Sequence, residues 1–527
     1  MHEQSENGLA NKSPAEDAAA GQRAEKISLG KTAGKGFSWI TFSLVLGKVL
    51  IFIAQIVLGW ILTEEDFGVL AIVASFIAFI RIFQDGGLSQ VLVQRGSARF
   101  QDLQGIGFWL VATVSIVAGI VMALLAPGIS WIYGDERLTP LLWVLASTLP
   151  LGAPATFMRA RLQIDLQFRV ISMIVAIRFL IRSVGMIVLA LLGFGTMSFV
   201  LPLVFVAIYD NLATYKYTRA KPWSATIAWG EWRSLVADSS WVVATAVFRG
   251  LARNGDYLVL GLLIPTNLVG LYFFGYQLTI QFTWLIALNL RHVFFPILSQ
   301  LADQPARQAA AISRTLRMLM LVMAPTNMLF AVTIAPLEEL IWHQKWAAAV
   351  PLMQIFAVVS PILIFSDIVS AALASRGQYR LGGLLVFLEG AWLLFSAWLA
   401  VMIAGTENIT LIASWIFALQ VAFLLTESAL ILNTFTIRPP AFFRSFLPQW
   451  STALGAAGIT AVIGRTLPAG MLPVAQVVVL AILYLVSFSL LAVWLLRSDL
   501  KELANVAPGP LGKVLSKVFF LRPGVVK

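Results

Sequence analysis

The chain has 527 residues, of which 59% are apolar and only 12% carry a charge. A soluble globular protein has about 25% charged residues, so this composition excludes a soluble enzyme and indicates an all-α polytopic membrane protein. The formal net charge of +11 does not call for a nucleic-acid partner, because basic residues gather in the cytoplasmic loops of membrane proteins.

The sequence contains no signature of an enzyme or a metalloprotein. Cysteine is absent, and the three histidines are scattered at His2, His292 and His343. These observations exclude disulfides and thiolate metal sites, and they predict no metal cluster. Neither a Walker A loop nor a nucleophile triad occurs in sequence context. We therefore expect a protein without a cofactor and without enzymatic activity.

The chain begins with a polar segment and continues with a series of apolar runs. Residues 1–36 lack the apolar core of a cleavable signal peptide, which predicts a disordered cytoplasmic tail. A membrane-spanning helix needs about 20 mostly apolar residues. By that rule the sequence predicts fourteen spans, at 37–62, 67–94, 104–126, 138–158, 168–192, 196–216, 236–263, 268–297, 313–335, 347–374, 380–403, 409–433, 448–465 and 472–496.

The last segment, residues 497–527, is predicted to be a second cytoplasmic tail. Within it, Leu511–Arg522 has apolar residues at helical spacing with basic residues between them. This segment either lies on the anionic inner leaflet or is disordered.

The charged residues agree with an even number of spans, which places both termini on one side. Most of the 37 basic residues then fall in the tails and in the connections on that side. The positive-inside rule identifies that side as the cytoplasm. The turns on the opposite side are acidic and contain Glu64, Glu65, Asp66, Asp135, Glu136, Glu338, Glu339 and Glu407.

The sequence also contains a weak internal repeat with an offset of 202 residues. This shift places Ser38-Trp39 on Ser240-Trp241, Val57-Leu58-Gly59 on Val259-Leu260-Gly261, and Gly68 on Gly270. Six spans separate the matched positions, so the repeat is parallel, with its axis along the membrane normal. Transporters with such repeats hold their substrate at the repeat interface and rock one bundle against the other.

The repeat divides the chain into two bundles. We predict a six-helix bundle at 37–220, a second six-helix bundle at 221–440, and two additional helices at 441–496.

Basic residues inside the predicted spans are the candidate site residues. An arginine at the centre of a membrane helix costs about 2.5–3.5 kcal/mol, so each must face a partner, water or a cavity. Arg178 and Arg182 lie four residues apart and share a helix face, as do Arg249 and Arg253. We expect these two pairs, one from each bundle, to face a central cavity together with Lys48.

Structural alternatives remain open for several of these charges. Arg81 and Asp85 are four residues apart and are expected to pair with each other. Arg291 lies near a helix end and can extend its side chain to the interface. Arg178 and Arg182 have no acidic residue in their own span, although another helix can supply one.

Acidic residues are more numerous in the second bundle. Asp367, Glu389 and Asp256 are candidates for a site that couples transport to a proton or sodium ion. The alternative is that they brace the arginines of the same bundle, since Asp256 follows Arg253 by three residues.

Arginine dominates the buried cations, and this indicates the chemistry of the substrate. The planar guanidinium matches phosphate and carboxylate oxygens in a bidentate way, which an ammonium group cannot do. The sequence therefore favours an anionic substrate with phosphate or carboxylate groups.

Two segments resemble a known family. Thr63–Arg95 contains Asp66-Phe67-Gly68, then Asp85-Gly86-Gly87-Leu88-Ser89, then Gln94-Arg95. Arg253–Leu278 contains an Asn-x-Asp-Tyr piece followed by glycine and tyrosine residues. Both segments resemble Wzx-type polysaccharide flippases of the multidrug/oligosaccharidyl-lipid/polysaccharide exporter superfamily.

The resemblance implies a V-shaped pair of six-helix bundles around a cationic cavity, in the bacterial inner membrane. It implies flipping of undecaprenyl-pyrophosphate-linked oligosaccharide from the cytoplasmic to the periplasmic leaflet, for O-antigen, capsule or exopolysaccharide assembly. Arg178 and Arg182 would bind the pyrophosphate, with Arg249, Arg253 and Lys48 facing them. The implied partners are the lipid-linked substrate, membrane lipids, and polysaccharide polymerase and chain-length or export proteins.

Two alternatives belong to the same superfamily. A flippase for the peptidoglycan precursor, lipid II, has the same chemistry with a different sugar. A cation-coupled multidrug exporter prefers cationic drugs, which a cavity lined by arginines should repel.

Overall fold

The computed structural model describes residues 39–85, 88–225, 230, 232–287, 294, 297–468 and 470–506. The backbone alone is described for 79–85, 88–102, 238, 241–242, 282, 284–287 and 506. Every regular element in these residues is a helix. Short connections join the helices, as the predicted tight turns require.

The helices follow the predicted spans in order. Their bounds are Trp39–Ile61 for the first helix, then α2 Glu64–Asp85, α3 Leu88–Tyr133, α4 Leu138–Ile164, α5 Phe168–Leu191, α6 Met197–Thr218, α7 Trp232–Leu263, α8 Thr266–Ala287, α10 Pro305–Trp342, α11 Val350–Leu363, α12 Phe365–Ser375, α13 Tyr379–Ala404, α14 Ile409–Asn433, α15 Pro439–Arg444, α16 Leu447–Gly464, α17 Pro473–Leu495 and α18 Arg497–Val506. Two short 3-10 helices, η1 Pro222–Ser224 and η3 Ala347–Ala349, lie in connections.

Two boundaries differ from the prediction. The span predicted at 67–94 ends at Asp85, and the following residues belong to α3, which has 46 residues. Gly86 and Gly87, between the two ranges, lie outside the described residues. The span predicted at 347–374 is divided into α11 and α12, which meet at Ile364.

The lengths of the helices suit a bilayer. In the part of the chain that the structure describes, ten helices are long and apolar enough to cross a membrane. The four other predicted spans are filled by α2, α7, α8 and α16, which have 22, 32, 22 and 18 residues. At about 1.5 Å per residue, even the shortest extends roughly 27 Å. The fold is therefore the predicted fourteen-helix membrane architecture.

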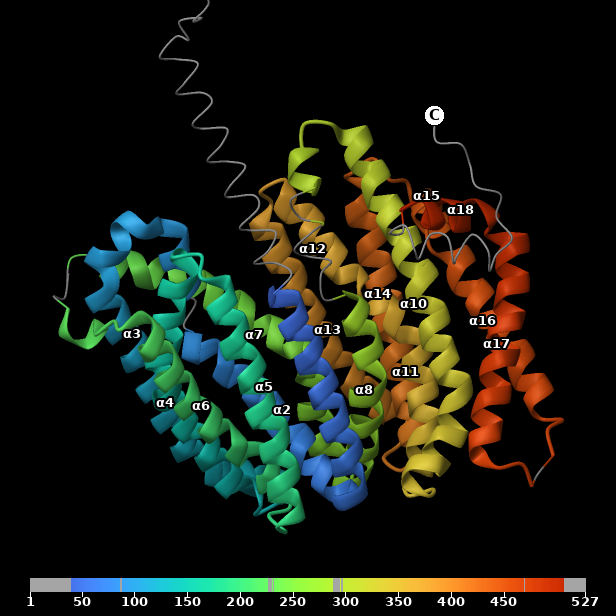
Figure 1. Ribbon diagram of the computed structural model, residues 1–527, viewed down its shortest axis with the longest axis horizontal. Coiled ribbons are helices and arrows are strands. Elements are labelled where there is room, and N and C mark those ends of the chain that lie inside the picture. Colours follow the sequence, from blue (N-terminus) through green and yellow to red (C-terminus); the bar gives the residue numbers. More distant parts are fainter. Residues whose placement is uncertain are drawn as a thin grey trace, which may run out of the picture.

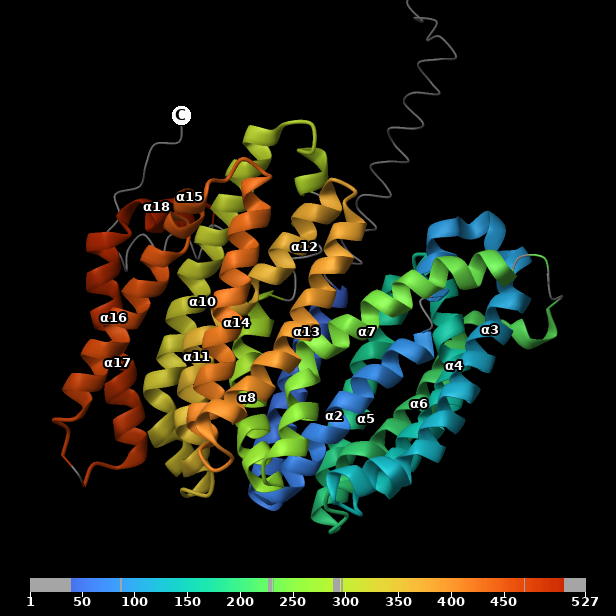
Figure 2. The same ribbon diagram turned by 180° about the vertical axis from the view of Figure 1, so that it is seen from behind.

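The helices form two lobes that give the molecule a V shape (Figures 1 and 2). The first lobe contains α3 to α6, which pack against one another. The second contains α8 and α10 to α14, with α16 and α17 packed on the outer side of α10. The lobes splay apart toward the end that carries α15 and α18 (Figures 1 and 2). They converge at the other end, which we call the closed end.

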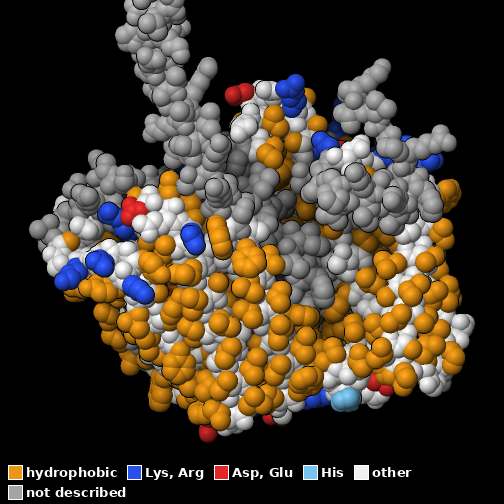
Figure 3. Space-filling model, viewed as in Figure 1, with side chains coloured by type: hydrophobic (Ala, Val, Ile, Leu, Met, Phe, Trp, Pro, Cys, Tyr) orange, Lys and Arg blue, Asp and Glu red, His pale blue; other side chains and the backbone are white. Residues whose placement is uncertain are grey.

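The surface agrees with a membrane protein. Figure 3 shows a broad area of apolar side chains across the face in view, with most of the visible Lys and Arg side chains near the splayed end. Acidic side chains line the rim of the closed end in the same view. Arg137 joins two of the predicted acidic turns there, because its guanidinium lies 2.8 Å from Asp135 and 3.5 Å from Asp66. Burial acts to raise the pKa of Asp135. The hydrogen bonds from Arg137 outweigh this effect and leave that pKa below its usual value.

The internal repeat is visible as a reciprocal contact where α2 crosses α8. A Cβ atom added at Gly68 would lie 1.9 Å from the carbonyl oxygen of Thr266. One added at Gly270 would lie 1.8 Å from the carbonyl oxygen of Glu64. The offset of 202 residues places Glu64 on Thr266 and Gly68 on Gly270. The two contacts therefore exchange partners, as contacts across a two-fold axis do.

A second pair of contacts obeys the same rule. A Cβ atom at Gly59 would lie 3.1 Å from the ring of Phe274, and one at Gly261 would lie 2.8 Å from the side chain of Ile72. The same offset places Gly59 on Gly261 and Ile72 on Phe274. The parallel repeat is confirmed, and its axis passes between α2 and α8 at the closed end.

Side chains from the second half cap the first helix at the closed end. The last carbonyl groups of a helix lack partners within it. Here the indole N–H of Trp346 donates to Gly59 O at 3.0 Å, and that of Trp342 donates to Ile56 O, three residues earlier in the helix, at 3.1 Å. The Lys345 ammonium donates to Trp60 O at 2.9 Å and to Leu62 O at 2.7 Å. These bonds hold the two halves together at that end.

Candidate functional site

The first lobe contains a pocket with charged lining residues between α2, α4, α5 and α6. Its volume is about 360 Å³. The predicted pair Arg178 and Arg182 lines it from α5, since residues four apart share a helix face. Arg159 from α4 and Asp210 from α6 complete the charged lining. Among the lining residues that the structure describes, three are arginines and one is a carboxylate, so basic groups outnumber acidic ones there.

Asp210 is the carboxylate on which two of these arginines converge. The Nε of Arg178 donates to Oδ1 of Asp210 at 3.2 Å, and a terminal nitrogen of Arg178 lies 2.9 Å from Oδ2. A terminal nitrogen of Arg159 donates to Oδ2 at 3.4 Å. The Asp210 side chain is only 7% exposed. For Arg178, another helix does supply the acidic partner that the sequence left open.

Sequence reasoning did not identify Arg159 as a site residue. It lies near the end of a predicted span, and its charge fits the positive-inside pattern of the neighbouring connection. The one available signal was Asp210, an acidic residue in an otherwise apolar run. That signal shows that a cationic partner is needed, although it does not show which helix supplies it.

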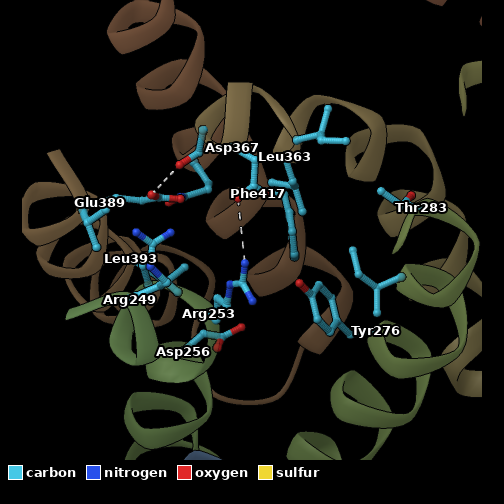
Figure 4. Close-up of a pocket in the computed structure, with 16 residues that line it drawn as sticks. Arg249, Arg253, Asp256, Tyr276, Thr283, Leu363, Asp367, Glu389, Leu393 and Phe417 are labelled. Atoms are coloured by element: carbon cyan, nitrogen blue, oxygen red, sulfur yellow. Dashed lines mark hydrogen bonds and ion pairs between the residues drawn. The ribbon is translucent and has the colours of Figure 1, made fainter. Parts of the chain in front are cut away.

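The second lobe contains a smaller charged pocket, shown in Figure 4. Its volume is about 100 Å³. Arg249, Arg253 and Asp256 line it from α7, and Asp367 and Glu389 line it from α12 and α13. The structure thus brings together the predicted arginine pair and all three acidic residues proposed for ion coupling.

The bonds at this pocket connect four helices, α7, α8, α12 and α13. A terminal nitrogen of Arg253 lies 4.0 Å from Oδ1 of Asp367, and the Ser366 hydroxyl donates to Oε2 of Glu389 at 2.8 Å (Figure 4). Asp256 accepts hydrogen bonds from the Tyr272 hydroxyl at 2.8 Å and from the backbone N–H of Tyr257 at 3.0 Å. Asp256 is therefore held by neutral donors on one side of the pocket.

Lys48 occupies a third position, between the halves. Its ammonium donates to Oε1 of Gln281 at 3.3 Å, which links the first helix to α8. The remaining predicted charges lie outside the described side chains. These are the expected pair Arg81 and Asp85, together with Arg291.

The two arginine pairs therefore line different pockets, one in each lobe. The first pocket has an excess of positive charge and is the larger of the two. The second contains two arginines and three carboxylates and is small. The first arrangement suits an anion with several oxygens, because guanidinium groups bind such oxygens in a bidentate way. The second suits a small cation or a proton.

Comparison with known proteins agrees with this architecture. The sequence pattern of the family described as polysaccharide biosynthesis protein matches residues 57–351, which is more than half of the chain. The chain is 22% identical to the lipopolysaccharide biosynthesis protein WzxC of Escherichia coli, over 67% of this chain and 72% of that protein. It is 21% identical to the teichuronic acid biosynthesis protein TuaB of Bacillus subtilis, over 80% of this chain and 86% of that protein.

Solved structures share the fold. The lipid II flippase MurJ, in an inward closed conformation, superposes with a TM-score of 0.67 at 11% identity, covering 86% of this chain and 98% of that chain. A multidrug resistance MATE transporter in its inward-facing conformation gives a TM-score of 0.55 at 14% identity, covering 76% of this chain and 96% of that chain. Both are transport proteins, and at these identities the likeness establishes the fold.

The match over residues 57–351 agrees with the Wzx-type resemblance carried by Thr63–Arg95 and Arg253–Leu278. The fourteen-helix fold and the paired lobes agree with it independently, and together they indicate transport rather than enzymatic catalysis. The chain belongs to the family of polysaccharide biosynthesis proteins, as a Wzx-type membrane transport protein.

Proposed function

We propose that this protein flips undecaprenyl-pyrophosphate-linked oligosaccharide from the cytoplasmic to the periplasmic leaflet of a bacterial inner membrane. The observation that carries the proposal is the first-lobe pocket, which Arg159, Arg178 and Arg182 line together with the buried carboxylate of Asp210. Burial of arginines is costly, and a pyrophosphate that enters the pocket would compensate their charge.

The related proteins support the proposal that the anionic group of the substrate carries a glycan. Their names assign them to lipopolysaccharide, teichuronic acid and, in the case of ExoT of Rhizobium meliloti, succinoglycan biosynthesis. The product of this protein would accordingly serve O-antigen, capsule or exopolysaccharide assembly. A polysaccharide polymerase and chain-length or export proteins are the partners that such a pathway requires.

The V shape supports alternating access as the mechanism. With both termini in the cytoplasm, the splayed end faces the cytoplasm and the closed end faces the periplasm. The lipid-linked substrate would enter between the lobes, and its pyrophosphate would bind the arginines. Rocking of the lobes about the axis between α2 and α8 would then open the closed end.

The second-lobe pocket is proposed to supply the driving force. Asp367, Glu389 and Asp256 would take up a proton or a sodium ion, and Arg249 and Arg253 would hold the carboxylates in position between the steps of the cycle. The hydrogen bond from Lys48 to Gln281 links the two halves, so it would depend on their relative position.

The test is the lipid content of cells that lack the protein. We expect a complete polyprenyl-pyrophosphate glycan to accumulate on the inner leaflet and surface polymer to be lost. Replacing both arginines of the first pair, Arg178→Ala with Arg182→Ala, should reproduce this defect at normal protein levels, because the pyrophosphate would lose two of its ligands.

The matched control is Arg161→Ala on α4, which removes an exposed arginine paired with Asp165 four residues away. This variant should flip normally. Flipping that survives loss of Arg178 and Arg182 would remove the pyrophosphate role. Accumulation of the peptidoglycan precursor would identify a lipid II flippase, and unchanged glycan lipids together with drug sensitivity would identify a drug exporter.

A further inference from the structure

Asp210 occupies the position in the first-lobe pocket that an anionic ligand needs. Its two oxygens engage guanidinium groups from two other helices, Arg159 on α4 and Arg178 on α5, at 2.9–3.4 Å. The carboxylate is 7% exposed, whereas these arginine side chains are 27% and 25% exposed. The arginines are therefore more accessible than the carboxylate, although Asp210 also lines the pocket.

Carboxylate and phosphate oxygens are equivalent ligands for a guanidinium fork. An anion that enters this pocket must share or replace the bonds that Asp210 makes. A pyrophosphate has more oxygens and more charge than a carboxylate. It can therefore displace Asp210 from one arginine while Asp210 keeps its bond to the other. A neutral or cationic ligand has no means of doing so.

The balance of charge supports exchange rather than permanent binding. Without Asp210, Arg159 and Arg178 would lose the carboxylate that they share, which would destabilise the lobe when no ligand is bound. With no competing carboxylate, they would also hold an anion too tightly to release it. A site that transports must bind strongly enough to load and weakly enough to unload.

We infer that Asp210 is a built-in counter-ion of a pyrophosphate site and that Arg159 is a third ligand of that site, beside Arg178 and Arg182. In the empty protein Asp210 positions Arg159 and Arg178. When pyrophosphate binds, it takes over part of these bonds, and when it leaves, Asp210 recovers them. This inference rests on the proposed function and adds two residues to its site.

The experiment measures ligand binding to the purified full-length protein in lipid nanodiscs. The probes are farnesyl pyrophosphate and inorganic pyrophosphate, titrated calorimetrically. Asp210→Asn should bind farnesyl pyrophosphate more tightly than the wild type, by roughly fivefold or more, because a like charge next to the ligand is removed. Arg159→Gln should bind it several-fold more weakly, because a ligand is lost.

The controls separate this role from a structural one. Asp210→Glu keeps the charge and should bind like the wild type. Asp165→Asn removes the acidic partner of the exposed Arg161 on the same lobe and should leave binding unchanged. If Asp210→Asn does not fold, the weaker binding predicted for Arg159→Gln still tests the site.

A folded Asp210→Asn variant that binds either probe equally or more weakly would overturn the counter-ion role, and so would a wild type that binds neither probe. Tighter binding of farnesyl pyrophosphate than of inorganic pyrophosphate would support a lipid headgroup as the source, and equal binding would support a soluble pyrophosphate at the same site. Failure of the flippase function itself would be seen separately, as unchanged glycan lipids in cells that lack the protein.

Discussion

Arginines line a pocket in each lobe, and the two pockets differ in the acidic groups that accompany them. In the first lobe, Arg159 and Arg178 share Asp210, and positive charge remains in excess. In the second, Arg249 and Arg253 lie among Asp256, Asp367 and Glu389. The same residue type thus leaves one pocket suited to an anion and the other suited to a small cation.

This difference gives a prediction for Glu389 in the second lobe. Glu389→Gln should abolish the dependence of flipping on a proton or sodium gradient, because loss of a carboxylate leaves the pocket with too little negative charge to attract a cation. Pyrophosphate binding in the first lobe should be unaffected. The measurement is glycan-lipid flipping in inverted membrane vesicles with and without an imposed gradient.

The control for this prediction is Glu407→Gln, which changes an exposed carboxyl in the turn between α13 and α14. It should flip with normal gradient dependence. Gradient dependence that persists in Glu389→Gln would show that Glu389 only braces the neighbouring arginines.

At the scale of the helices, the crossing of α2 and α8 determines how the halves meet. Gly68 and Gly270 permit backbone contact there, since a Cβ atom at either would approach a carbonyl oxygen to less than 2 Å. A backbone carbonyl within a helix cannot move aside as a flexible side chain can. The two glycines are therefore required by close approach and not by turn geometry.

Gly68→Ala and Gly270→Ala should each destabilise the protein by about 1–3 kcal/mol, the usual cost of overpacking. The measurement is thermal unfolding in detergent, followed by the fluorescence of the tryptophans at the closed end. Gly382→Ala and Gly458→Ala are matched controls, because a Cβ atom at either helical position meets nothing within 4 Å. These should be neutral or slightly stabilising. Equal melting temperatures for all four variants would contradict the close approach of α2 and α8.

For the molecule as a whole, the proposed alternating access requires that the closed end opens. The bonds from Trp342, Lys345 and Trp346 to the end of the first helix must then break in each cycle. The chain contains no native cysteine, so a pair of cysteines can be introduced without background reactions.

A cross-link between Leu62→Cys and Lys345→Cys should stop flipping, because it would join the halves where they must separate. Reduction of the cross-link should restore activity. A matched cross-link between Gln449→Cys and Asp499→Cys joins α16 to α18 within the second lobe, where the native side chains lie 2.7 Å apart, and should leave flipping intact. If the protein cross-linked at the closed end still flips its substrate normally, opening of that end during transport would be excluded.

The architecture could be predicted because its signals are local in the sequence. The length of an apolar run determines whether it can span a bilayer, and the side of each connection follows from its charges. The repeat offset of 202 residues was detectable at Gly59 and Gly68, because close helix crossings require small residues at fixed positions.

By itself, the sequence determined that the chain is a helical membrane protein with two related halves and buried cations. Only the tertiary structure decided which acidic groups those cations meet. Arg178 and Arg159 reach Asp210 across separations of 32 and 51 residues, and Arg253 reaches Asp367 from another helix. Hydrophobic length is a property of one segment, whereas a pair of buried charges depends on the rotation and packing of several helices, which periodicity in a single helix does not specify.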